Sequence, residues 1–306
     1  MTILQRLFLS FFCLFIGFNT AHAQEPFAAE ILKFEAADSA VAPVTGQIML
    51  YGSSTFRFWK TAETDCAFKD FKVVNRGFGG SQTVDAIRYF ERVVVPHRPK
   101  YLFFYEGDND LNAGKSVDSV YQDIALFVKN LRKTLPKTRF IFCSVKPSPS
   151  RWAIFDKQKE LNQRVFELAK RTKRMYYLDM VTPMLDATGK PIEAIFIQDK
   201  LHMNADGYAL WAKKVQWFWQ TLWALIQFFQ THSHIAAHSF FFKLKKRRNY
   251  VQLCGYVFKK IKLADSYIRI ALNIRLNINA LIQLNTTSWA FATRYMRRRV
   301  NHNVAT

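Results

Sequence analysis

The sequence has few cysteines, and their spacing matches neither a zinc site nor a disulfide scaffold. Of the four, Cys13 lies in the N-terminal apolar segment after "SFF", which lacks the small residues of a lipoprotein signal, so no lipid-anchored cysteine is expected. Cys66, Cys143 and Cys254 cannot all pair with one another. An oxidising compartment permits a Cys66–Cys143 disulfide, but we do not predict it, because Cys143 lies in an apolar strand and suits a buried small residue.

Long apolar runs are also scarce, and the first of them has the features of a secretory signal. The run "LFLSFFCLFIGF" (Leu7–Phe18) is short for a membrane span, and a positive Arg6 precedes it. The small-x-small pattern "AHA" (Ala21–Ala23) then forms a cleavage site. We therefore expect residues 1–23 to be a signal peptide and the protein to be exported, either periplasmic or secreted. An uncleaved N-terminal anchor is the alternative.

Acidic residues are nearly missing from the C-terminal part of the chain. Residues 226–306 hold 14 Lys and Arg but one acid, Asp265, whereas residues 1–225 hold 30 Lys and Arg and 22 acids. The net charge of +21 would first suggest a nucleic acid or an anionic membrane as partner. Because most of that charge belongs to the tail, it does not decide the function of the rest, and no nucleic-acid partner is expected.

Three interpretations of the tail, residues 226–306, stay open. It is a basic appendage that contacts a membrane surface or a polyanion, a small helical addition, or translated sequence beyond the natural end of the domain. The apolar run Trp217–Phe229 has only 13 residues, so we expect it to extend a last helix rather than to cross a bilayer. We favour the third interpretation because the preceding domain closes near residue 220.

The chain is rich enough in apolar side chains to bury a large core, since 50% of its residues are hydrophobic and 16% are aromatic. Apolar runs alternate with segments of helical periodicity. The expected strands are Gln47–Gly52, Phe71–Gly77, Lys100–Gly107, Arg139–Val145 and Arg174–Met180, and the expected helices are Thr83–Val94, Val117–Thr134, Asp156–Thr172 and one beginning near Asn204. This alternation predicts an α/β fold, a three-layer α/β/α sandwich with a five-stranded parallel sheet.

Polar loops follow the first three expected strands. They read "GSST", "NRGFGGSQT" and "GDNDLNAG". Because the carboxyl ends of parallel strands lie at one edge of the sheet, the three loops are expected to meet there and to form a binding site. Gly52 permits a sharp turn into Ser53 and Ser54, whose hydroxyls would face that edge. Either serine is a candidate nucleophile; the alternative is that it caps the next helix.

Few histidines are available to act as the base that a serine nucleophile requires. Of seven, one lies in the signal and four in the tail, which leaves His97 and His202. His97 precedes the third strand, at the opposite edge of the sheet. His202 follows the fifth strand and stands three residues after Asp199 in "DKLH". Asp199 could accept the imidazole N–H and leave the other ring nitrogen to the serine; an ordinary helix start is the alternative.

Four motifs in order resemble the blocks of the SGNH/GDSL hydrolase superfamily. They are "GSST" at Gly52–Thr55, "GFGGS" at Gly77–Ser81, "GDND" at Gly107–Asp110 and "DKLH" at Asp199–His202. The wider stretches "NRGFGGSQ", "GDNDLNAGKS" and "KPSPSRW" look like a bacterial secreted branch labelled GDSL-type esterase or lipase. The resemblance implies the flavodoxin-like SGNH fold, over residues 46–225, with residues 24–45 as a lead segment.

The resemblance implies a role for each matching residue. Ser54 would be the nucleophile, His202 the general base, and Asp199 the group that orients His202. The backbone N–H groups of Ser54 and Gly80 and the side-chain amide of Asn109 would form the oxyanion hole. No metal or cofactor is implied. One departure is that Ser53 replaces the usual Asp of "GDS", which leaves a second hydroxyl beside Ser54.

The substrate follows less directly from the residues. Arg151 and Trp152 lie in the loop after the fourth strand and could bind a substrate, with Trp152 stacking on a sugar; packing and solvation are the alternative. The absence of a long apolar lid favours short acyl groups, such as acetyl on carbohydrate or a similar small-molecule ester. A lysophospholipase or thioesterase on the same site, and a non-catalytic protein that binds envelope polymer, are the rival functions. The sequence does not determine the oligomeric state.

Overall fold

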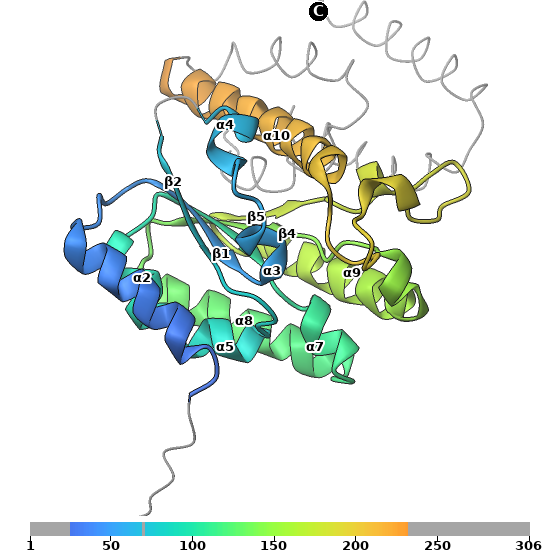
Figure 1. The fold of residues 1–306 in the computed structure, drawn as a ribbon. Coiled ribbons are helices and arrows are strands. Elements are labelled where there is room, and N and C mark those ends of the chain that lie inside the picture. The colour runs from blue at the N-terminus through green and yellow to red at the C-terminus, as the bar shows by residue number, and fades with distance from the viewer. Residues whose placement is uncertain (1–24, 69–70, 232–306) are drawn as a thin grey trace, which may run out of the picture. The chain divides into compact units, whose positions relative to one another are not determined.

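Five short apolar strands form one parallel sheet in the computed structural model, which describes residues 25–68 and 71–231. The strands lie in the order β2-β1-β3-β4-β5 (Figure 1). Their bounds are β1 (Ile48–Gly52), β2 (Val73–Gly77), β3 (Tyr101–Tyr105), β4 (Arg139–Cys143) and β5 (Met175–Leu178). This is the flavodoxin-like order, and the predicted α/β fold with a five-stranded parallel sheet is confirmed.

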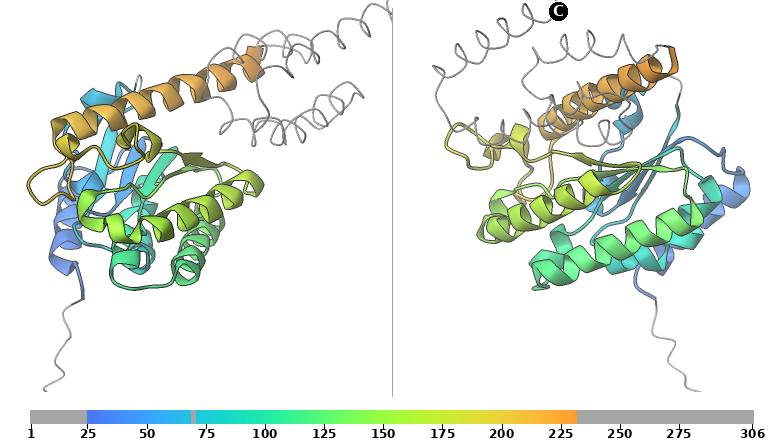
Figure 2. Two further views of the ribbon diagram at one scale, coloured as in Figure 1. Left: turned by 90° about the vertical axis from the view of Figure 1, so that its right-hand side faces the viewer. Right: turned by 180° about the vertical axis from the view of Figure 1, so that it is seen from behind.

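Helices cover both faces of the sheet. One face packs against α2 (Ala28–Ala40), α5 (Thr83–Arg88), α6 (Phe90–Val93), α8 (Val117–Thr134) and α9 (Phe155–Arg171), and the other against α4 (Ala62–Cys66) and α10 (Ala205–Thr231). Figure 2 shows α10 and α8 on opposite sides of the strands. Two short helices, α3 (Ser54–Arg57) and α7 (Asp108–Asn112), follow β1 and β3. The 3₁₀ helices are Val95–His97, Pro149–Ile154, Thr182–Met184 and Glu193–Ile195.

The central strand β3 is buried along its whole length, because alternate side chains pack into the apolar layers on the two sides of the sheet. On one face, the ring of Phe104 stacks on Phe127 of α8 with centroids 4.3 Å apart. On the other, Phe103 packs edge-on to Phe218 of α10 at 6.3 Å. A strand with apolar residues on both faces is what a sheet between two helical layers requires. The continuous apolar run "YLFFY" therefore has a direct structural cause.

The predicted helix over residues 83–94 is broken in two, whereas the long helices match their predicted ranges closely. The break falls at Tyr89, whose backbone leaves the helical region at φ −95° and ψ 4°. The buried Tyr89 side chain donates a hydrogen bond to the carbonyl of Pro26, in the N-terminal segment. This contact lies 63 residues away in sequence, so local helical periodicity could not reveal it.

The lead segment contributes helix α2 to the domain. Ile31 is fully buried in the core, and Glu30 pairs with Arg57 of α3 at 3.0 Å. Asp38 accepts a hydrogen bond from Arg76 and lies 2.9 Å from His97 Nε2. His97 is thus paired with Asp38 at the far edge of the sheet, away from the loops that follow the strands, as the sequence predicts.

Several sequence predictions fall partly or wholly outside the described residues. These are the signal peptide (1–23), most of the basic tail (226–306) and Cys254. Helix α10 runs through the predicted boundary between residues 225 and 226 and ends at Thr231. Within the part of the chain that the structure describes, Cys66 and Cys143 are both buried free thiols, and no helix is long and apolar enough to cross a membrane.

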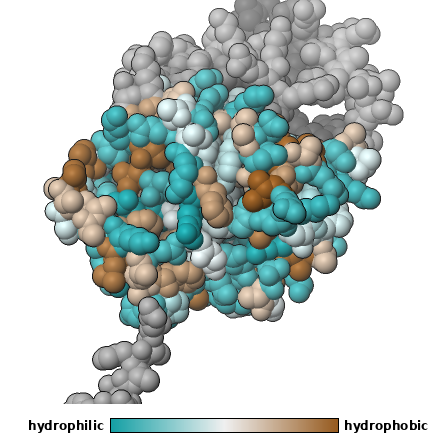
Figure 3. All heavy atoms as spheres, in the orientation of Figure 1, coloured by the Kyte–Doolittle hydropathy of each residue, from teal (hydrophilic) through white to brown (hydrophobic). Residues whose placement is uncertain are grey.

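The surface mixes apolar and polar residues. On the face drawn in Figure 3, hydrophobic residues occur in small groups among hydrophilic ones. The large hydrophobic side chains that are exposed include Leu32, Val41, Val44, Phe58, Val84, Leu126, Trp152 and Ile197. Scattered exposed apolar residues are normal for a folded domain. Phe58, Trp152 and Ile197 are of interest because they lie next to the candidate site in sequence.

Candidate active site

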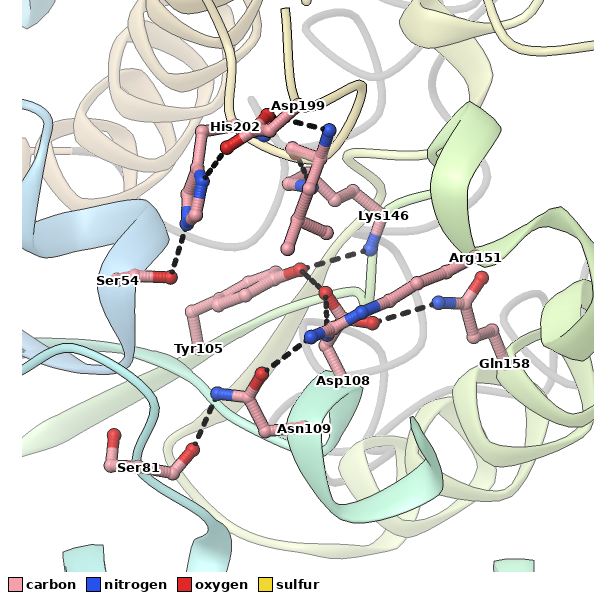
Figure 4. A network of polar contacts seen from close by, with 11 residues as sticks. Ser54, Ser81, Tyr105, Asp108, Asn109, Lys146, Arg151, Gln158, Asp199 and His202 are labelled. Atoms are coloured by element: carbon pink, nitrogen blue, oxygen red, sulfur yellow. Dashed lines mark hydrogen bonds and ion pairs between the residues drawn. The ribbon is translucent and has the colours of Figure 1, made fainter. Parts of the chain in front are cut away.

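The register of the three central strands brings the polar loops together. Gly52 at the end of β1 is aligned with Gly77 of β2 on one side and with Tyr105 of β3 on the other. The loops that follow these three residues therefore start in one row at one edge of the sheet. The loop after β5 carries Asp199 and His202 to the same place, where Ser54 and Asn109 also lie (Figure 4).

A close approach between β1 and β3 directs the chain toward Ser54. Gly52 has φ +141°, and a Cβ on it would lie 2.1 Å from the carbonyl oxygen of Tyr105. Only glycine is compatible with that contact. The N–H of Ser53 donates to the same Tyr105 carbonyl at 3.1 Å, and α3 begins at the next residue. Ser53 is consequently buried, whereas Ser54 is partly exposed at the site.

Ser54, His202 and Asp199 form a hydrogen-bonded chain. His202 Nε2 lies 2.9 Å from Ser54 Oγ, and His202 Nδ1 lies 2.6 Å from Asp199 Oδ2. A carboxylate can only accept, so Nδ1 carries the proton and Nε2 is free to accept the serine hydroxyl. The predicted triad residues, separated by 148 positions between Ser54 and His202, are thus in direct contact.

The loop that carries Asp199 and His202 keeps the Asp199 carboxyl group ionised. Its Oδ1 accepts the backbone N–H groups of Leu201 and His202, each at 2.9 Å. Partial burial would raise the pKa of Asp199, but the hydrogen bonds from the His202 ring and from these two N–H groups outweigh it and lower the pKa to about 2. Asp199 therefore stays a carboxylate at any pH near neutrality, and it can compensate a positive charge on His202.

Gly80 and Asn109 lie in the two loops beside the serine. Gly80 has φ +84°, and a Cβ on it would meet nothing within 4 Å. The left-handed backbone at this position is what favours glycine. Asn109 donates from Nδ2 to the Ser81 carbonyl at 2.8 Å. A primary amide has a second N–H, which remains for a ligand.

Arg151 holds the Asn109 amide from its oxygen side. Its Nη2 donates to Asn109 Oδ1 at 2.9 Å, and its Nη1 pairs with Asp108 Oδ2 at 2.9 Å. The side chains of Arg151 and Asp108 are only 11% and 5% exposed. Gln158 donates to the other oxygen of Asp108 at 2.9 Å. Both ends of the Arg151 guanidinium are therefore occupied by protein groups, which orients the amide so that its nitrogen faces the Ser81 carbonyl (Figure 4).

Trp152 follows Arg151 but has a different environment. Its side chain is 37% exposed, and its ring stacks on Phe155 with centroids 4.6 Å apart. Near the triad, the ring of Phe58 is 48% exposed and meets the His202 ring edge-on at 4.8 Å. Phe58 is therefore a partly exposed aromatic side chain in contact with His202, and the sequence analysis did not predict it.

The other acidic residues near the site have structural partners. Asp110 is buried and accepts hydrogen bonds from the Thr83 backbone N–H and from Lys115, both at about 3 Å. These hydrogen bonds fix the loop of Asp110 against the start of α5. Asp85 accepts the backbone N–H of Gln82 at 2.9 Å and caps α5. Among residues 25–68 and 71–231, no group of His, Cys, Asp or Glu is arranged to hold a metal ion.

Glu106 is a buried carboxyl group directly behind the loop that contains Gly80. Its Oε1 lies 2.7 Å from Ser81 Oγ, which also lies 3.0 Å from the Phe78 carbonyl. The Ser81 hydroxyl donates to Glu106, and its one proton is shared with the nearby Phe78 carbonyl. Burial, together with the nearby Asp110, Asp85 and Asp108 carboxylates, raises the pKa of Glu106 well above its usual range.

The chain is similar in sequence to one protein family. A family model described as the GDSL-like Lipase/Acylhydrolase family matches residues 38–210, more than half of the chain. A comparison with curated proteins finds no match.

Solved structures share the fold at low sequence identity. A GDSL-like lipase from Bacteroides thetaiotaomicron is 20% identical over 63% of this chain and 98% of its own, with a TM-score of 0.54. A Bacteroides fragilis protein, provisionally described as an acylhydrolase, is 20% identical over 63% and 97%, with a TM-score of 0.54. A Streptococcus pneumonia protein, provisionally described as a platelet activating factor, is 18% identical over 62% and 91%, with a TM-score of 0.56.

The raised pKa of Glu106 predicts how stability depends on pH. The folded state keeps a proton that the unfolded state releases above its ordinary pKa of about 4.3, so the free energy of unfolding falls as pH rises, by up to ~1.4 kcal/mol per pH unit. We expect Glu106→Gln, which keeps the shape without a titrating proton, to remove this fall. Urea unfolding of both proteins at pH 5 and pH 8 measures it.

Glu160→Gln is the matched control, because the Glu160 side chain is 61% exposed on α9. It should keep the pH dependence of the unsubstituted protein. A Glu106→Gln variant that loses stability with rising pH as steeply as this control would contradict the assignment of a proton to Glu106.

Proposed function

Since the chain belongs to the GDSL-like lipase/acylhydrolase family and is a hydrolase of ester bonds, we propose that it is a serine esterase that works through an acyl-enzyme on Ser54. The observation that carries this proposal is the continuous chain from Ser54 Oγ through the His202 ring to Asp199, with contacts of 2.9 Å and 2.6 Å. A protein that only binds its ligand has no need of a nucleophile, a base and an orienting carboxylate in contact.

The steps follow from the chemistry of these three groups. Ser54 Oγ attacks the ester carbonyl carbon while His202 Nε2 takes its proton, which gives a tetrahedral oxyanion and an imidazolium. The imidazolium then protonates the leaving alcohol as the bond between the carbonyl carbon and the alkoxy oxygen breaks. In the second half, His202 takes a proton from water, which attacks the acyl-enzyme carbonyl carbon; the imidazolium then returns the proton to Ser54 Oγ as the bond between the carbonyl carbon and Oγ breaks and the acid leaves. Asp199 keeps its charge throughout and stabilises the imidazolium.

The oxyanion is proposed to be bound by neutral donors from three loops. These are the backbone N–H groups of Ser54 and Gly80 and the second amide hydrogen of Asn109. Donors of this kind act best when they are held rigidly before the charge develops. Arg151 and the Asp108 carboxylate behind it supply that rigidity for Asn109, so we assign Arg151 to orienting the amide rather than to contacting the substrate.

The substrate is proposed to be a small-molecule or glycan ester with a short acyl group, such as acetyl on carbohydrate. The sequence between Ser54 and His202 contains no long apolar insertion that could form a lid over an acyl chain. Trp152 and Phe58 offer partly exposed aromatic faces, which suit stacking on the apolar face of a sugar. A lysophospholipase or thioesterase would use the same groups on a long acyl chain and is the alternative.

The proposed place of action is outside the cytoplasm, in the periplasm or the medium. The support is the signal-like pattern of residues 1–23. The basic tail, residues 226–306, is proposed to contact a membrane surface or an anionic polymer if it is a native part of the protein. A non-catalytic polymer-binding protein with this tail is the rival from another functional class.

The serine assignment predicts opposite results for two neighbouring substitutions. Ser54→Ala should lower kcat for p-nitrophenyl acetate by at least ~10³-fold, because the nucleophile is lost. Ser53→Ala should keep most of the activity, because the Ser53 side chain is buried behind the turn. Steady-state rates of the two folded full-length variants and the unsubstituted protein measure the difference.

Circular dichroism of all three proteins is the control for folding. Loss of activity in Ser53→Ala with full activity in Ser54→Ala would reverse the assignment. A folded, unsubstituted protein that binds anionic polymer but turns over no ester would favour the binding function instead.

The substrate proposal predicts a preference for short acyl chains. With p-nitrophenol as the common leaving group, kcat/KM for the acetyl ester should exceed that for the octanoyl ester by ~10-fold or more, because the sequence between Ser54 and His202 has no long apolar insertion to cover a longer chain. Rates measured below the critical micelle concentration of the octanoyl ester test this. A higher kcat/KM for octanoyl would support the lysophospholipase or thioesterase alternative.

A further inference from the structure

Lys146 is a buried lysine directly beneath the loop that carries Asp199 and His202. It lies three residues after β4 and is 1% exposed. Its Nζ donates to the carbonyl oxygen of Leu201 at 2.7 Å, and it lies 5.5 Å from the centre of the Phe196 ring. Leu201 immediately precedes His202, so the ammonium group holds the backbone between Asp199 and His202 (Figure 4).

This cation has no carboxylate in contact. Within the described part of the chain, no Asp or Glu oxygen lies within 4 Å of Lys146 Nζ. Asp108 and Asp199 attract it only at longer range, and Arg151 repels it. Burying a charge without a partner costs free energy that an apolar side chain of the same length would not cost. Stability alone therefore does not explain a lysine at this position.

The backbone of the loop explains what the lysine does. Lys200 has a left-handed backbone with φ +54°, which a residue with a side chain adopts only when its surroundings hold it. Three successive backbone carbonyls of this loop accept hydrogen bonds. The Lys200 carbonyl accepts the Ser150 N–H at 3.1 Å, the Leu201 carbonyl accepts Lys146 Nζ, and the His202 carbonyl accepts the Ile197 N–H at 2.9 Å. Two of the donors, Lys146 and Ser150, lie in the segment between β4 and α9. The hydrogen bond from Lys146 is charge-assisted and is therefore stronger than one between neutral groups.

We propose that Lys146 is a positioning residue that fixes the loop Ile197–His202, so that His202 Nε2 faces Ser54, at a cost in stability. The expected effect on catalysis rests on the proposed function, whereas the hydrogen bond from Lys146 to Leu201 is an observation of the structure. Misplacing a general base by a fraction of an ångström is enough to slow a proton transfer. Loss of the hydrogen bond from Lys146 to Leu201 should therefore lower kcat rather than weaken the binding of substrate.

The charge on Lys146 should also be visible in the pH dependence. Burial lowers the pKa of Lys146 to about 8, with Asp108 and Asp199 opposing that shift and Arg151 adding to it. Tyr105, whose hydroxyl lies 3.4 Å from the Lys146 backbone N–H, stays a neutral phenol because burial raises its pKa well above the usual range. Above pH ~8 the neutral amine makes a weaker bond to Leu201, so kcat should fall on the alkaline side.

The test compares Lys146→Met with Lys129→Met, a control at an exposed position of α8, both in the full chain. Lys146→Met should lower kcat for p-nitrophenyl acetate by ~10- to ~100-fold with little change in KM, and should lose the alkaline fall near pH 8. Its midpoint in urea unfolding should equal or exceed that of the unsubstituted protein. Lys129→Met should match the unsubstituted protein in each measurement.

Two results would overturn the proposal. One is an unchanged kcat and pH profile in folded Lys146→Met. The other is a loss of kcat that accompanies a lower unfolding midpoint, which a merely structural lysine would produce. If Lys146→Met does not fold, Lys146→Gln, which keeps a donor but not the charge, takes its place with the same expected and contradicting results.

A spectroscopic readout separates this proposal from the proposed function. With ¹⁵N-labelled histidine, the ring signals of His202 should report a fixed Nδ1–H tautomer in the unsubstituted protein and in Lys129→Met, and an averaged tautomer in Lys146→Met. An unsubstituted protein without esterase activity would contradict the proposed function, while this comparison would still decide the role of Lys146. Identical His202 signals in all three proteins would overturn the positioning role.

Discussion

The hydrogen bond between Ser54 and His202 depends on the register of β1 with its neighbours. Gly52 is level with Gly77 and Tyr105, and its missing side chain allows the Tyr105 carbonyl to approach and to accept the Ser53 N–H. This contact turns the chain so that Ser54 starts a helix over the sheet edge. A shift of β1 by one residue would exchange its two faces and move the serine out of reach of the histidine.

Behind the proposed triad lies a layer of buried polar groups that costs stability and supplies rigidity. The Arg151–Asp108 pair holds the amide of Asn109, Glu106 holds the loop of Gly80 by accepting the Ser81 hydroxyl, and Lys146 holds the loop of His202. Each group acts on a different part of the site. Such arrangements favour a fixed geometry over the most stable core, which is common where chemistry requires preorganised groups.

The fold and the proposed triad were predictable from the sequence, because they depend on local patterns. Continuous apolar runs alternating with helical periodicity define the strands and layers, and the ordered motifs point to Ser54, Asp199 and His202. The oxyanion candidates Gly80 and Asn109 followed from the same motifs. The break at Tyr89 was not predicted; it coincides with a hydrogen bond from the Tyr89 side chain to Pro26, a distant contact that local periodicity does not report.

The supporting groups were harder to find for a similar reason. For Arg151 the sequence left substrate binding and packing both open, because its partners Asp108 and Asn109 lie at least 42 residues away in sequence and nothing local shows that they are in contact with it. Glu106 and Lys146 left a weak signal, because each is an ionisable residue close after a largely apolar strand: Glu106 directly follows β3, and Lys146 directly follows the expected strand Arg139–Val145. That pattern predicts a buried charged or protonated group, but not the carbonyl or hydroxyl that it holds.

The covalent intermediate on Ser54 is the central claim, and labelling with a fluorophosphonate ester tests it most directly. The reagent phosphonylates a serine only where a base activates the hydroxyl. Intact-mass and peptide mass spectrometry of the full chain should show one phosphonyl group, located on Ser54 and missing from a folded His202→Ala variant. A folded protein that stays unlabelled, or a label on Ser53 or another residue, would contradict the account.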